Sequence, residues 1–269
     1  MNSNRHIEIM GIVNLTDDSY YAESRCSCAD TAIRRATQLL SEGADIIDLG
    51  ACSTRPGSQP VGEEEEWRRL APVLESMKRE FPDVRISVDT YWSSVVEKAY
   101  DLVGPFIVND ISAGEDDPAM LPTVGRLGLE YIAMHKRGDS VTMQTLTDYK
   151  DVVAEVRDYF HKFAIKAGEA GIARWTLDPG FGFAKTVEQN YTLLSNLDTL
   201  KIDYNGFSPR ILVGISRKSM IYKLLDITPD EALPATQALH FAALCRGADI
   251  LRVHDVKEAV QTVTLYHMV

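Results

Sequence analysis

Short apolar runs recur along the chain, and each is followed by a longer stretch in which apolar residues return every three or four positions. The short runs are mostly continuous rather than alternating, as is typical of parallel strands that are buried on both faces. We therefore predict eight strands. They cover residues 7–13, 45–49, 85–88, 106–109, 131–134, 175–177, 211–214 and 250–253.

Helices are predicted in the stretches between these strands. Trp67, Leu70, Leu74 and Met77 show the spacing of a core-facing helical stripe. The acidic run at residues 63–66 is predicted to be the solvated first turn of that helix, where negative charge suits the helix dipole. The segment 216–225 is predicted to be an extra turn or short helix that precedes the longer helix at 230–246. The other predicted helices cover residues 30–41, 93–103, 118–127, 148–170, 186–194, 230–246 and 256–266.

Eight strands, each followed by a helix, predict an α/β fold, a (β/α)₈ TIM barrel. The chain has 269 residues and no linker-like segment, so residues 1–269 are expected to form a single domain. The alternative is an open doubly wound sheet, but no GxGxxG follows the first strand. The loops after strands 1 and 2, residues 14–29 and 51–62, are long and are expected to close over a substrate.

Composition excludes several classes of protein. The net charge of −11 argues against general nucleic-acid binding, and no apolar run is long enough to span a membrane. The start of the chain lacks the features of a signal peptide. Cys26, Cys28, Cys52 and Cys245 do not make a disulfide framework in a chain this long, and Cys26-Ser-Cys28 lacks the second half of a zinc site. We expect reduced thiols and a cytoplasmic protein.

The segment WTLDPGFGFAKTVEQN, residues 175–190, suggests the chemistry of the site. Asp178 ends a strand, and the glycine-rich turn that follows leaves its carboxylate at the strand's C-terminal end. Phe181 and Phe183 provide flat apolar surface beside that charge. A carboxylate next to aromatic rings suits a flat heterocycle that is rich in N–H donors.

Polar or charged residues stand at nearly every predicted strand end. One such Asp is usually a helix cap, but acids, amides and cations that recur on one face of a barrel favour a shared site. The side chains of Asp89, Asn109 and Asp178 suit the N–H edge of a heterocycle, and no Ser-His-Asp or Cys-His arrangement indicates a nucleophile. The cationic or donor side chains suited to a diphosphate are Arg55, Arg252 and His254, and Asn14 is a candidate oxygen ligand for Mg²⁺. The strand-end residues are Asn14, Asp48, Asp89, Asn109, Asp110, His135, Asp178, Ser216, Arg217, Lys218, Arg252, His254 and Asp255.

These strand-end motifs together resemble the dihydropteroate synthase family over nearly the whole chain. Eight ordered motifs are far more specific than any one of them. They are MGIVNLTDDSYY, DIIDLGACSTRPG, ISVDT, IVNDISAG, MHKRG, LDPGFGFAK, VGISRKSM and LRVHDVKEA.

The resemblance implies an enzyme of folate biosynthesis that uses Mg²⁺ and is a target of sulfonamides. It would join 6-hydroxymethyl-7,8-dihydropterin diphosphate to 4-aminobenzoate, giving 7,8-dihydropteroate and diphosphate by an SN1-like loss of diphosphate. Ionised Asp89 and Asp178 would favour the cationic pterin that forms. The resemblance also implies a homodimer, with which Leu239, Phe241 and Leu244 are compatible.

The resemblance also implies roles for individual residues. The catalytic group would be Asp89, Asp178 and Lys218. The pterin would be bound by Asp89, Asn109, Met134, Asp178, Phe183, Gly214 and Lys218. The diphosphate would be held by Asn14, Arg55, Arg252 and His254, with Asn14 also on the metal. The 4-aminobenzoate would be surrounded by Tyr20, Thr54, Pro56, Phe183, Lys218 and Ser219.

Four residues depart from the family pattern, all of them in the two long loops. Asp17 replaces a common proline, Tyr20 a common phenylalanine, and Ala51-Cys52 a common Gly-Glu. Two other functions remain open. One is a methyltransferase domain that passes a methyl group from methyltetrahydrofolate to a corrinoid, and the other is a non-catalytic pterin-binding barrel. The motifs STRPG and SRKSM argue against the first, and the intact polar strand ends argue against the second.

Overall fold

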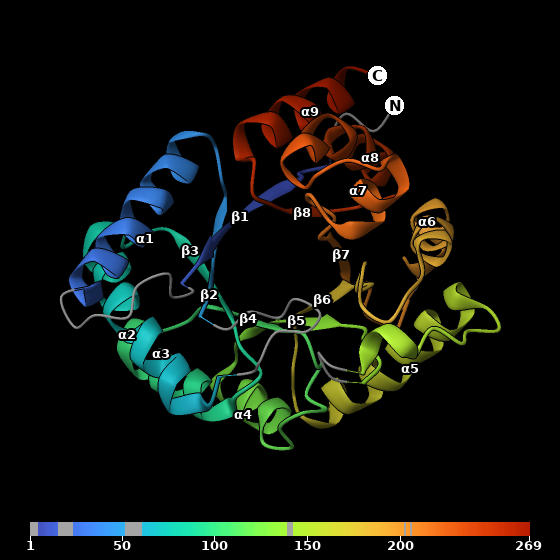
Figure 1. Ribbon diagram of the computed structural model, residues 1–269. Coiled ribbons are helices and arrows are strands. Elements are labelled where there is room, and N and C mark those ends of the chain that lie inside the picture. The colour runs from blue at the N-terminus through green and yellow to red at the C-terminus, as the bar shows by residue number, and fades with distance from the viewer. Residues whose placement is uncertain (1–4, 16–23, 52–60, 139–141, 202, 205) are drawn as a thin grey trace.

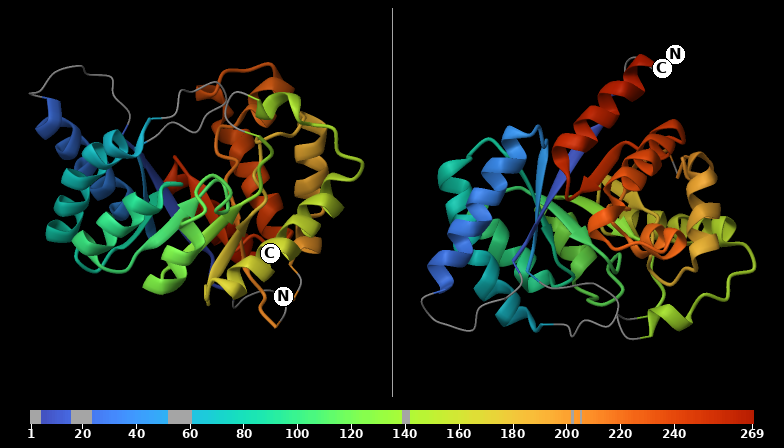
Figure 2. Two further views of the ribbon diagram at one scale, coloured as in Figure 1. Left: turned by 90° about the horizontal axis from the view of Figure 1, so that it is seen from below. Right: turned by 45° about the horizontal axis from the view of Figure 1, so that its top comes forward.

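The structure is a computed structural model that describes residues 5–15, 24–51, 61–138, 142–201, 203–204 and 206–269. For residues 24–28 and Gln144 only the backbone is described. The strands form a ring at the centre of the molecule, and the helices lie outside it (Figure 1). Two further views show the same outer layer of helices around the strands (Figure 2).

The sheet is a closed barrel in which neighbouring strands are parallel and follow one another in chain order. This confirms the predicted (β/α)₈ barrel, and each predicted strand agrees with the structure to within one residue at either end. The strands are β1 (Glu8–Asn14), β2 (Ile46–Gly50), β3 (Arg85–Asp89), β4 (Ile107–Asp110), β5 (Glu130–Met134), β6 (Trp175–Asp178), β7 (Arg210–Val213) and β8 (Ile250–Val253).

Every predicted helix is present, and all but the one at 93–103 have shifted ends. The first begins at Ser24 rather than residue 30, so the first long loop is shorter than predicted. The stretch predicted at 230–246 divides into a 3₁₀ turn, η3 (Asp230–Ala232), and a helix. The α-helices are α1 (Ser24–Ser41), α2 (Glu63–Glu80), α3 (Ser93–Val103), α4 (Met120–Leu127), α5 (Val152–Glu169), α6 (Val187–Ser195), α7 (Ser219–Leu225), α8 (Leu233–Cys245) and α9 (Val256–Met268), and the other 3₁₀ turns are η1 (Met143–Thr145) and η2 (Leu197–Leu200).

The start of α6 shows how the sequence sets a helix boundary next to the site. The Thr186 hydroxyl accepts a hydrogen bond from the Gln189 N–H, and the Gln189 side chain accepts one from the Thr186 N–H. This reciprocal pair satisfies two N–H groups that a helix end otherwise leaves unpaired. The turn between β6 and α6 is therefore anchored at its far end.

The interior of the barrel is filled in layers, because alternate residues of each strand point inward. The middle layer is an apolar cluster of its own, separate from the core between strands and helices, and it contains Met10, Ile46, Ile107, Ile132, Leu212 and Ile250. Toward the N-terminal ends of the strands lies a ring of ion pairs around Glu8. Toward the C-terminal ends lie Asp48, Asn109 and Arg252, where a barrel carries its chemistry.

The acidic run at 63–66 is the first turn of α2, as predicted, but one part of that prediction is wrong. Glu63 and Glu64 are exposed, whereas Glu66 is fully buried. Helical spacing places Glu66 on the same face as Leu70 and Val73, which pack toward the strands. Burial raises the pKa of Glu66 to about 7.

Candidate active site

Arg252 joins three strands at the C-terminal mouth of the barrel. Its Nε atom donates to Asp48 Oδ2 at 2.7 Å, and its Nη2 atom donates to Asp89 Oδ2 at 2.8 Å. The side chain of Asn109 donates to Asp48 Oδ1 at 3.3 Å. The ends of β2, β3, β4 and β8 therefore converge on one buried polar cluster, which includes the predicted residues Asp89, Asn109 and Arg252.

Asp48 is the member of this cluster to which the sequence assigned no role. Its side chain is fully buried, and it accepts hydrogen bonds from both Arg252 and Asn109. The signal in the sequence is a carboxylate inside the apolar strand IIDLG, since a buried charge needs a partner. The partner cannot be identified from that signal, because Arg252 lies far away in the chain.

Two carboxylates share one guanidinium in this cluster, and the electrostatics reflect that imbalance. Burial raises the pKa of Asp89 to about 7; Arg252 lowers it, and Asp48, Asp110 and Asp178 raise it further. Burial lowers the pKa of Arg252, but Asp48 and Asp89 outweigh that effect and leave it raised. The surroundings of Asp89 therefore oppose the full ionisation that the sequence suggested.

The turn after β6 carries the second group of predicted residues. Asp178 Oδ1 accepts a hydrogen bond from the Gly180 N–H at 2.8 Å. The Lys218 ammonium donates to the Phe181 carbonyl at 2.7 Å and lies 4.7 Å from the centre of the Phe183 ring. Burial raises the pKa of Asp178, although the nearby charge of Lys218 lowers it in part. Burial likewise lowers the pKa of Lys218 to about 8, although the charge of Asp178 raises it in part.

Glycine at position 180 is required by both conformation and space. Its φ angle is +69°, in the left-handed region that side chains rarely adopt, and a Cβ atom there would lie 1.9 Å from the His135 carbonyl oxygen. The turn thus packs directly on the end of β5. Met134 from that strand end joins Phe183 in one buried apolar cluster, so these two predicted ring-contacting residues lie together.

Two further glycines show that the polar groups share one mouth. A Cβ on Gly214 would lie 3.9 Å from Lys218 Nζ and 4.0 Å from Arg252 Cβ, so Gly214 lies close to both side chains. A Cβ on Gly50 would lie 3.7 Å from Asp89 Oδ2 and 3.9 Å from Asn14 Oδ1. Asn14 therefore lies beside Asp89, and both glycines line the same polar mouth of the barrel.

Comparison with known proteins identifies the family. Residues 10–254 match the model of a family described as pterin binding enzyme. The dihydropteroate synthase of Escherichia coli (strain K12) is 41% identical over 258 residues, which cover 95% of this chain and 89% of that protein. The chain belongs to the dihydropteroate synthase family.

Solved structures of dihydropteroate synthases share this fold closely. The Yersinia pestis enzyme in a sulfonamide drug complex superposes with a TM-score of 0.89 at 36% identity, covering 100% of this chain and 95% of that one. The Burkholderia cenocepacia enzyme complexed with 7,8-dihydropteroate superposes with a TM-score of 0.86 at 36% identity. The match covers 98% of this chain and 91% of that one. The chain is therefore a transferase of folate biosynthesis.

His254 and Ser219 lie at the same mouth of this dihydropteroate synthase-family barrel. His254 follows β8, and its Nδ1 lies 3.1 Å from the Ser216 hydroxyl. Ser219 opens α7, directly after Lys218. By contrast, Arg217 forms an ion pair with Asp255 at 2.8 Å and donates to two nearby carbonyls, so these two strand-end residues support the loops.

Several predicted residues lie outside the part of the chain that the structure describes. They are Tyr20, Thr54, Arg55 and Pro56, together with the divergent positions Asp17 and Cys52. Their assignment to diphosphate and 4-aminobenzoate stays a prediction.

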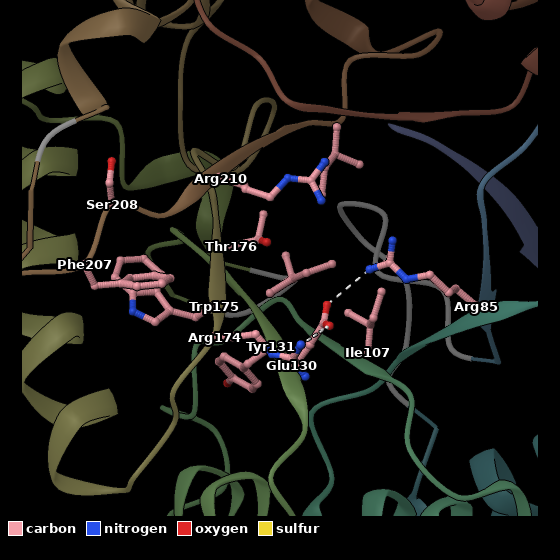
Figure 3. Close-up of a pocket in the computed structure, with 12 residues that line it drawn as sticks. Arg85, Ile107, Glu130, Tyr131, Arg174, Trp175, Thr176, Phe207, Ser208 and Arg210 are labelled. Atoms are coloured by element: carbon pink, nitrogen blue, oxygen red, sulfur yellow. Dashed lines mark hydrogen bonds and ion pairs between the residues drawn. The ribbon is translucent and has the colours of Figure 1, made fainter. Parts of the chain in front are cut away.

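A cavity of about 290 Å³ lies at the opposite mouth of the barrel (Figure 3). Arg85, Glu130 and Arg210 line it, with Trp175 and Phe207 on one side. Arg85 is paired with Glu8 at 2.7 Å and Glu130 at 3.2 Å, and Arg210 is paired with Glu8 at 2.7 Å. Since the N-terminal face of such a barrel serves stability, we read this cavity as part of the barrel floor.

The described residues include no group of three or more His, Cys, Asp or Glu side chains that could hold a metal ion. Mg²⁺ needs no such group, because it keeps several waters and is often held by one or two protein ligands and substrate phosphates. The exposed amide of Asn14 supplies an oxygen of the preferred kind at the mouth. In the same ranges, no helix combines the length and apolar character that a bilayer span requires.

Proposed function

We propose that the side chains gathered at the C-terminal mouth of this barrel carry out dihydropteroate synthesis. The reaction joins 6-hydroxymethyl-7,8-dihydropterin diphosphate to 4-aminobenzoate and releases diphosphate. The observation that carries the assignment of the site is the convergence of Asp48, Asp89, Asn109 and Arg252 beside Asp178 and Lys218 in a chain of this family.

The pterin is recognised by the buried acceptors. Asp89, Asn109 and Asp178 face a flat ring whose edge carries N–H donors, and each charge-assisted hydrogen bond contributes roughly 1.5–3 kcal/mol. Burial raises the pKa values of Asp89 and Asp178, and hydrogen bonds from pterin donors stabilise the ionised forms of both. Met134 and Phe183 supply the apolar surface for the ring.

The bond that breaks joins the pterin methylene carbon to the diphosphate oxygen. Its electron pair leaves with the diphosphate, and positive charge develops on the methylene, beside the carboxylates of Asp89 and Asp178. Arg252 and His254 lie where they can bind the leaving anion. Arg252 uses Nε and Nη2 for Asp48 and Asp89, so its contact with the diphosphate falls to Nη1.

The amine of 4-aminobenzoate then attacks the methylene carbon and loses one proton to solvent. An aromatic amine is neutral near pH 7, so this step needs no nucleophilic side chain and no strong base. We assign the aminobenzoate to the space beside Phe183, Lys218 and Ser219, with Tyr20, Thr54 and Pro56 completing it.

Mg²⁺ fits this site through Asn14, with Arg55 as a further partner of the diphosphate. When bound, the ion neutralises charge on the departing diphosphate. Asn14 would hold the ion through its amide oxygen, and its position beside Asp89 would keep the diphosphate next to the pterin pocket.

We also propose that the protein is a homodimer. Leu224 and Leu225 on α7 are 57% and 50% exposed, and Leu239 and Phe241 on α8 are partly exposed nearby in the chain. Leu244 is fully buried and belongs to the core instead. Analytical ultracentrifugation should give twice the chain mass, and Leu224→Lys should shift the protein toward monomer.

A cytoplasmic location is proposed from the cysteine content. Cys245 is a free and exposed thiol, a state that reducing compartments maintain. Cell fractionation of the tagged protein tests this.

Diphosphate release with and without 4-aminobenzoate tests the function and separates it from the alternatives. We expect release that depends on both the pterin diphosphate and 4-aminobenzoate. A corrinoid methyltransferase domain would release no diphosphate but would transfer a methyl group from methyltetrahydrofolate. A non-catalytic barrel would bind pterin and do neither.

A further inference from the structure

Lys185 is a buried lysine at the end of the turn that joins β6 to α6. Its residue is 4% exposed, and its Nζ atom lies 3.0 Å from each of three acceptors: the Gly180 carbonyl, the Phe183 carbonyl and His135 Nδ1. An ammonium has three N–H donors and no acceptor, so the geometry satisfies every donor of its charged form. This also requires His135 to be neutral with Nδ1 free to accept.

The turn that Lys185 closes has an unfavourable backbone. Gly180 and Gly182 have φ angles of +69° and +82°, and Ala184 has +50°. A non-glycine residue in this left-handed region costs roughly 1–2 kcal/mol, so the surrounding contacts must hold it there. Lys185 binds a carbonyl at either end of the Gly180–Phe183 segment, and no other described side chain does so.

The same turn presents the residues assigned to the pterin. Asp178 precedes it, the Phe181 carbonyl accepts from Lys218, and the Phe183 ring faces the Lys218 ammonium. His135 connects the two parts, because its N–H donates to the Asp178 carbonyl at 3.0 Å while its ring receives Lys185. Lys185 is also one of the cations whose charge acts on Asp178.

We propose that Lys185 is a positioning residue of the active site: its ammonium holds the β6–α6 turn in the shape that presents Asp178 and Phe183 to the pterin. The proposal rests on the assignment of those two residues to pterin binding. The ammonium itself touches no substrate and takes no part in bond breaking.

A merely structural role is the alternative, and the chemistry of the site argues against it. Burial lowers the pKa of Lys185 to about 7, because moving an ammonium out of water costs free energy. An apolar side chain of similar length fills such a space without that cost. The ammonium is useful here because it fixes the direction of three acceptors, which an apolar chain leaves free.

The test compares two ligands that approach the site from different sides. Lys185→Met keeps the length of the side chain and removes its donors. We expect the Kd for 6-hydroxymethylpterin, measured by calorimetry, to rise at least tenfold. The Kd for pyrophosphate with Mg²⁺ should stay within twofold, because its proposed ligands follow other strands. Lys166→Met, an exposed lysine on α5, is the matched control and should change neither value.

The two affinities distinguish a positioning residue from one that only stabilises the fold. If Lys185→Met raises the Kd for both ligands equally, or leaves the Kd for 6-hydroxymethylpterin unchanged, the positioning role is overturned. Asp178→Asn is measured alongside. If it binds 6-hydroxymethylpterin as tightly as the parent, the assignment of Asp178 fails, and the proposal with it. If Asp178→Asn weakens binding and Lys185→Met does not, only the positioning role fails.

A second variant decides the matter if Lys185→Met does not fold. His135→Leu keeps the ammonium and removes one of its three acceptors. We expect its Kd for 6-hydroxymethylpterin to rise at least threefold and its Kd for pyrophosphate with Mg²⁺ to stay within twofold of the parent value. An unchanged Kd for 6-hydroxymethylpterin in this variant would overturn the proposal.

Discussion

Asp89→Asn should raise the free energy of unfolding, measured without substrate, while it removes pterin affinity. Asp48 and Asp89 both contact Arg252, so two buried carboxylates share one guanidinium. Asparagine keeps an oxygen that can accept from Arg252 Nη2 but removes one negative charge. Arg252 and Asp48 then remain as a neutral pair. The pterin loses a carboxylate partner, so its affinity falls.

The size of the effect follows from the pKa of Asp89, which rises from 3.8 to about 7 on folding. Three pKa units correspond to roughly 4 kcal/mol. Between those two pH values the folded protein holds a proton that the unfolded chain has released, so the free energy of unfolding falls as the pH rises through this window. We expect Asp89→Asn to raise the free energy of unfolding by about half of that amount, ~2 kcal/mol, because water at the mouth relaxes around the charge. For a chain of this size, that gain corresponds to a Tm increase of about 4 °C.

Urea unfolding followed by tryptophan fluorescence measures the difference at two pH values. At pH 8 the variant should be more stable by ~2 kcal/mol, and at pH 5 the gain should shrink to less than half, because the parent's Asp89 is then largely protonated. Asp101→Asn, an exposed change on α3, serves as the control and should have no effect. A variant less stable than the parent at pH 8 would show that the Arg252–Asp89 pair is net stabilising and that our reasoning is wrong.

Three other predictions concern the turn after β6 and the lysine that faces it. Asp178→Asn should lower kcat/KM for the pterin diphosphate at least ~100-fold in a diphosphate-release assay while leaving the urea midpoint nearly unchanged; full activity would refute its electrostatic role. Gly180→Ala should lose pterin binding and several kcal/mol of stability, because its Cβ would meet the His135 carbonyl at 1.9 Å, whereas Gly128→Ala, also at positive φ but with nothing within 4 Å, should cost only about 1 kcal/mol. Because burial lowers the pKa of Lys218 to about 8, diphosphate release should decline as the pH rises past that value. Lys218→Met should release diphosphate more slowly at every pH and should not show that decline. If this variant still shows the decline, another group is responsible for the titration.

The sequence predicted the strands, and the barrel face on which polar side chains gather, better than the contacts among those side chains. Buried parallel strands are continuous apolar runs, and parallel strands bring their C-terminal ends to one face of a barrel, so Asp89, Asn109 and Asp178 could be placed together. Which acceptor each cation binds could not be predicted. Arg252 reaches Asp48 and Asp89 across the barrel, and Lys185 turns back onto Gly180 and Phe183.

Burial was the other property that the sequence did not reveal. Glu66 belongs to a run of four glutamates that looks solvated, and only the packing of α2 against the strands shows that one of them is inside. Sequence periodicity gives the face on which a residue lies, but the depth of that face depends on how the helix sits on the barrel.

The two mouths of the barrel use the same residue types to opposite effect. At the floor, burial raises the pKa of Glu8, but Arg210 and Arg85 outweigh it and leave the pKa lowered. Its stabilising effect is therefore present above the unfolded pKa and is lost as the pH falls through the folded one. Glu8→Gln should accordingly destabilise the protein at pH 8, the reverse of Asp89→Asn. We attribute this difference to the ratio of carboxylates to cations, which is higher at the mouth that binds substrate than at the floor that stabilises the barrel. If both substitutions shift the urea midpoint in the same direction, that explanation is wrong.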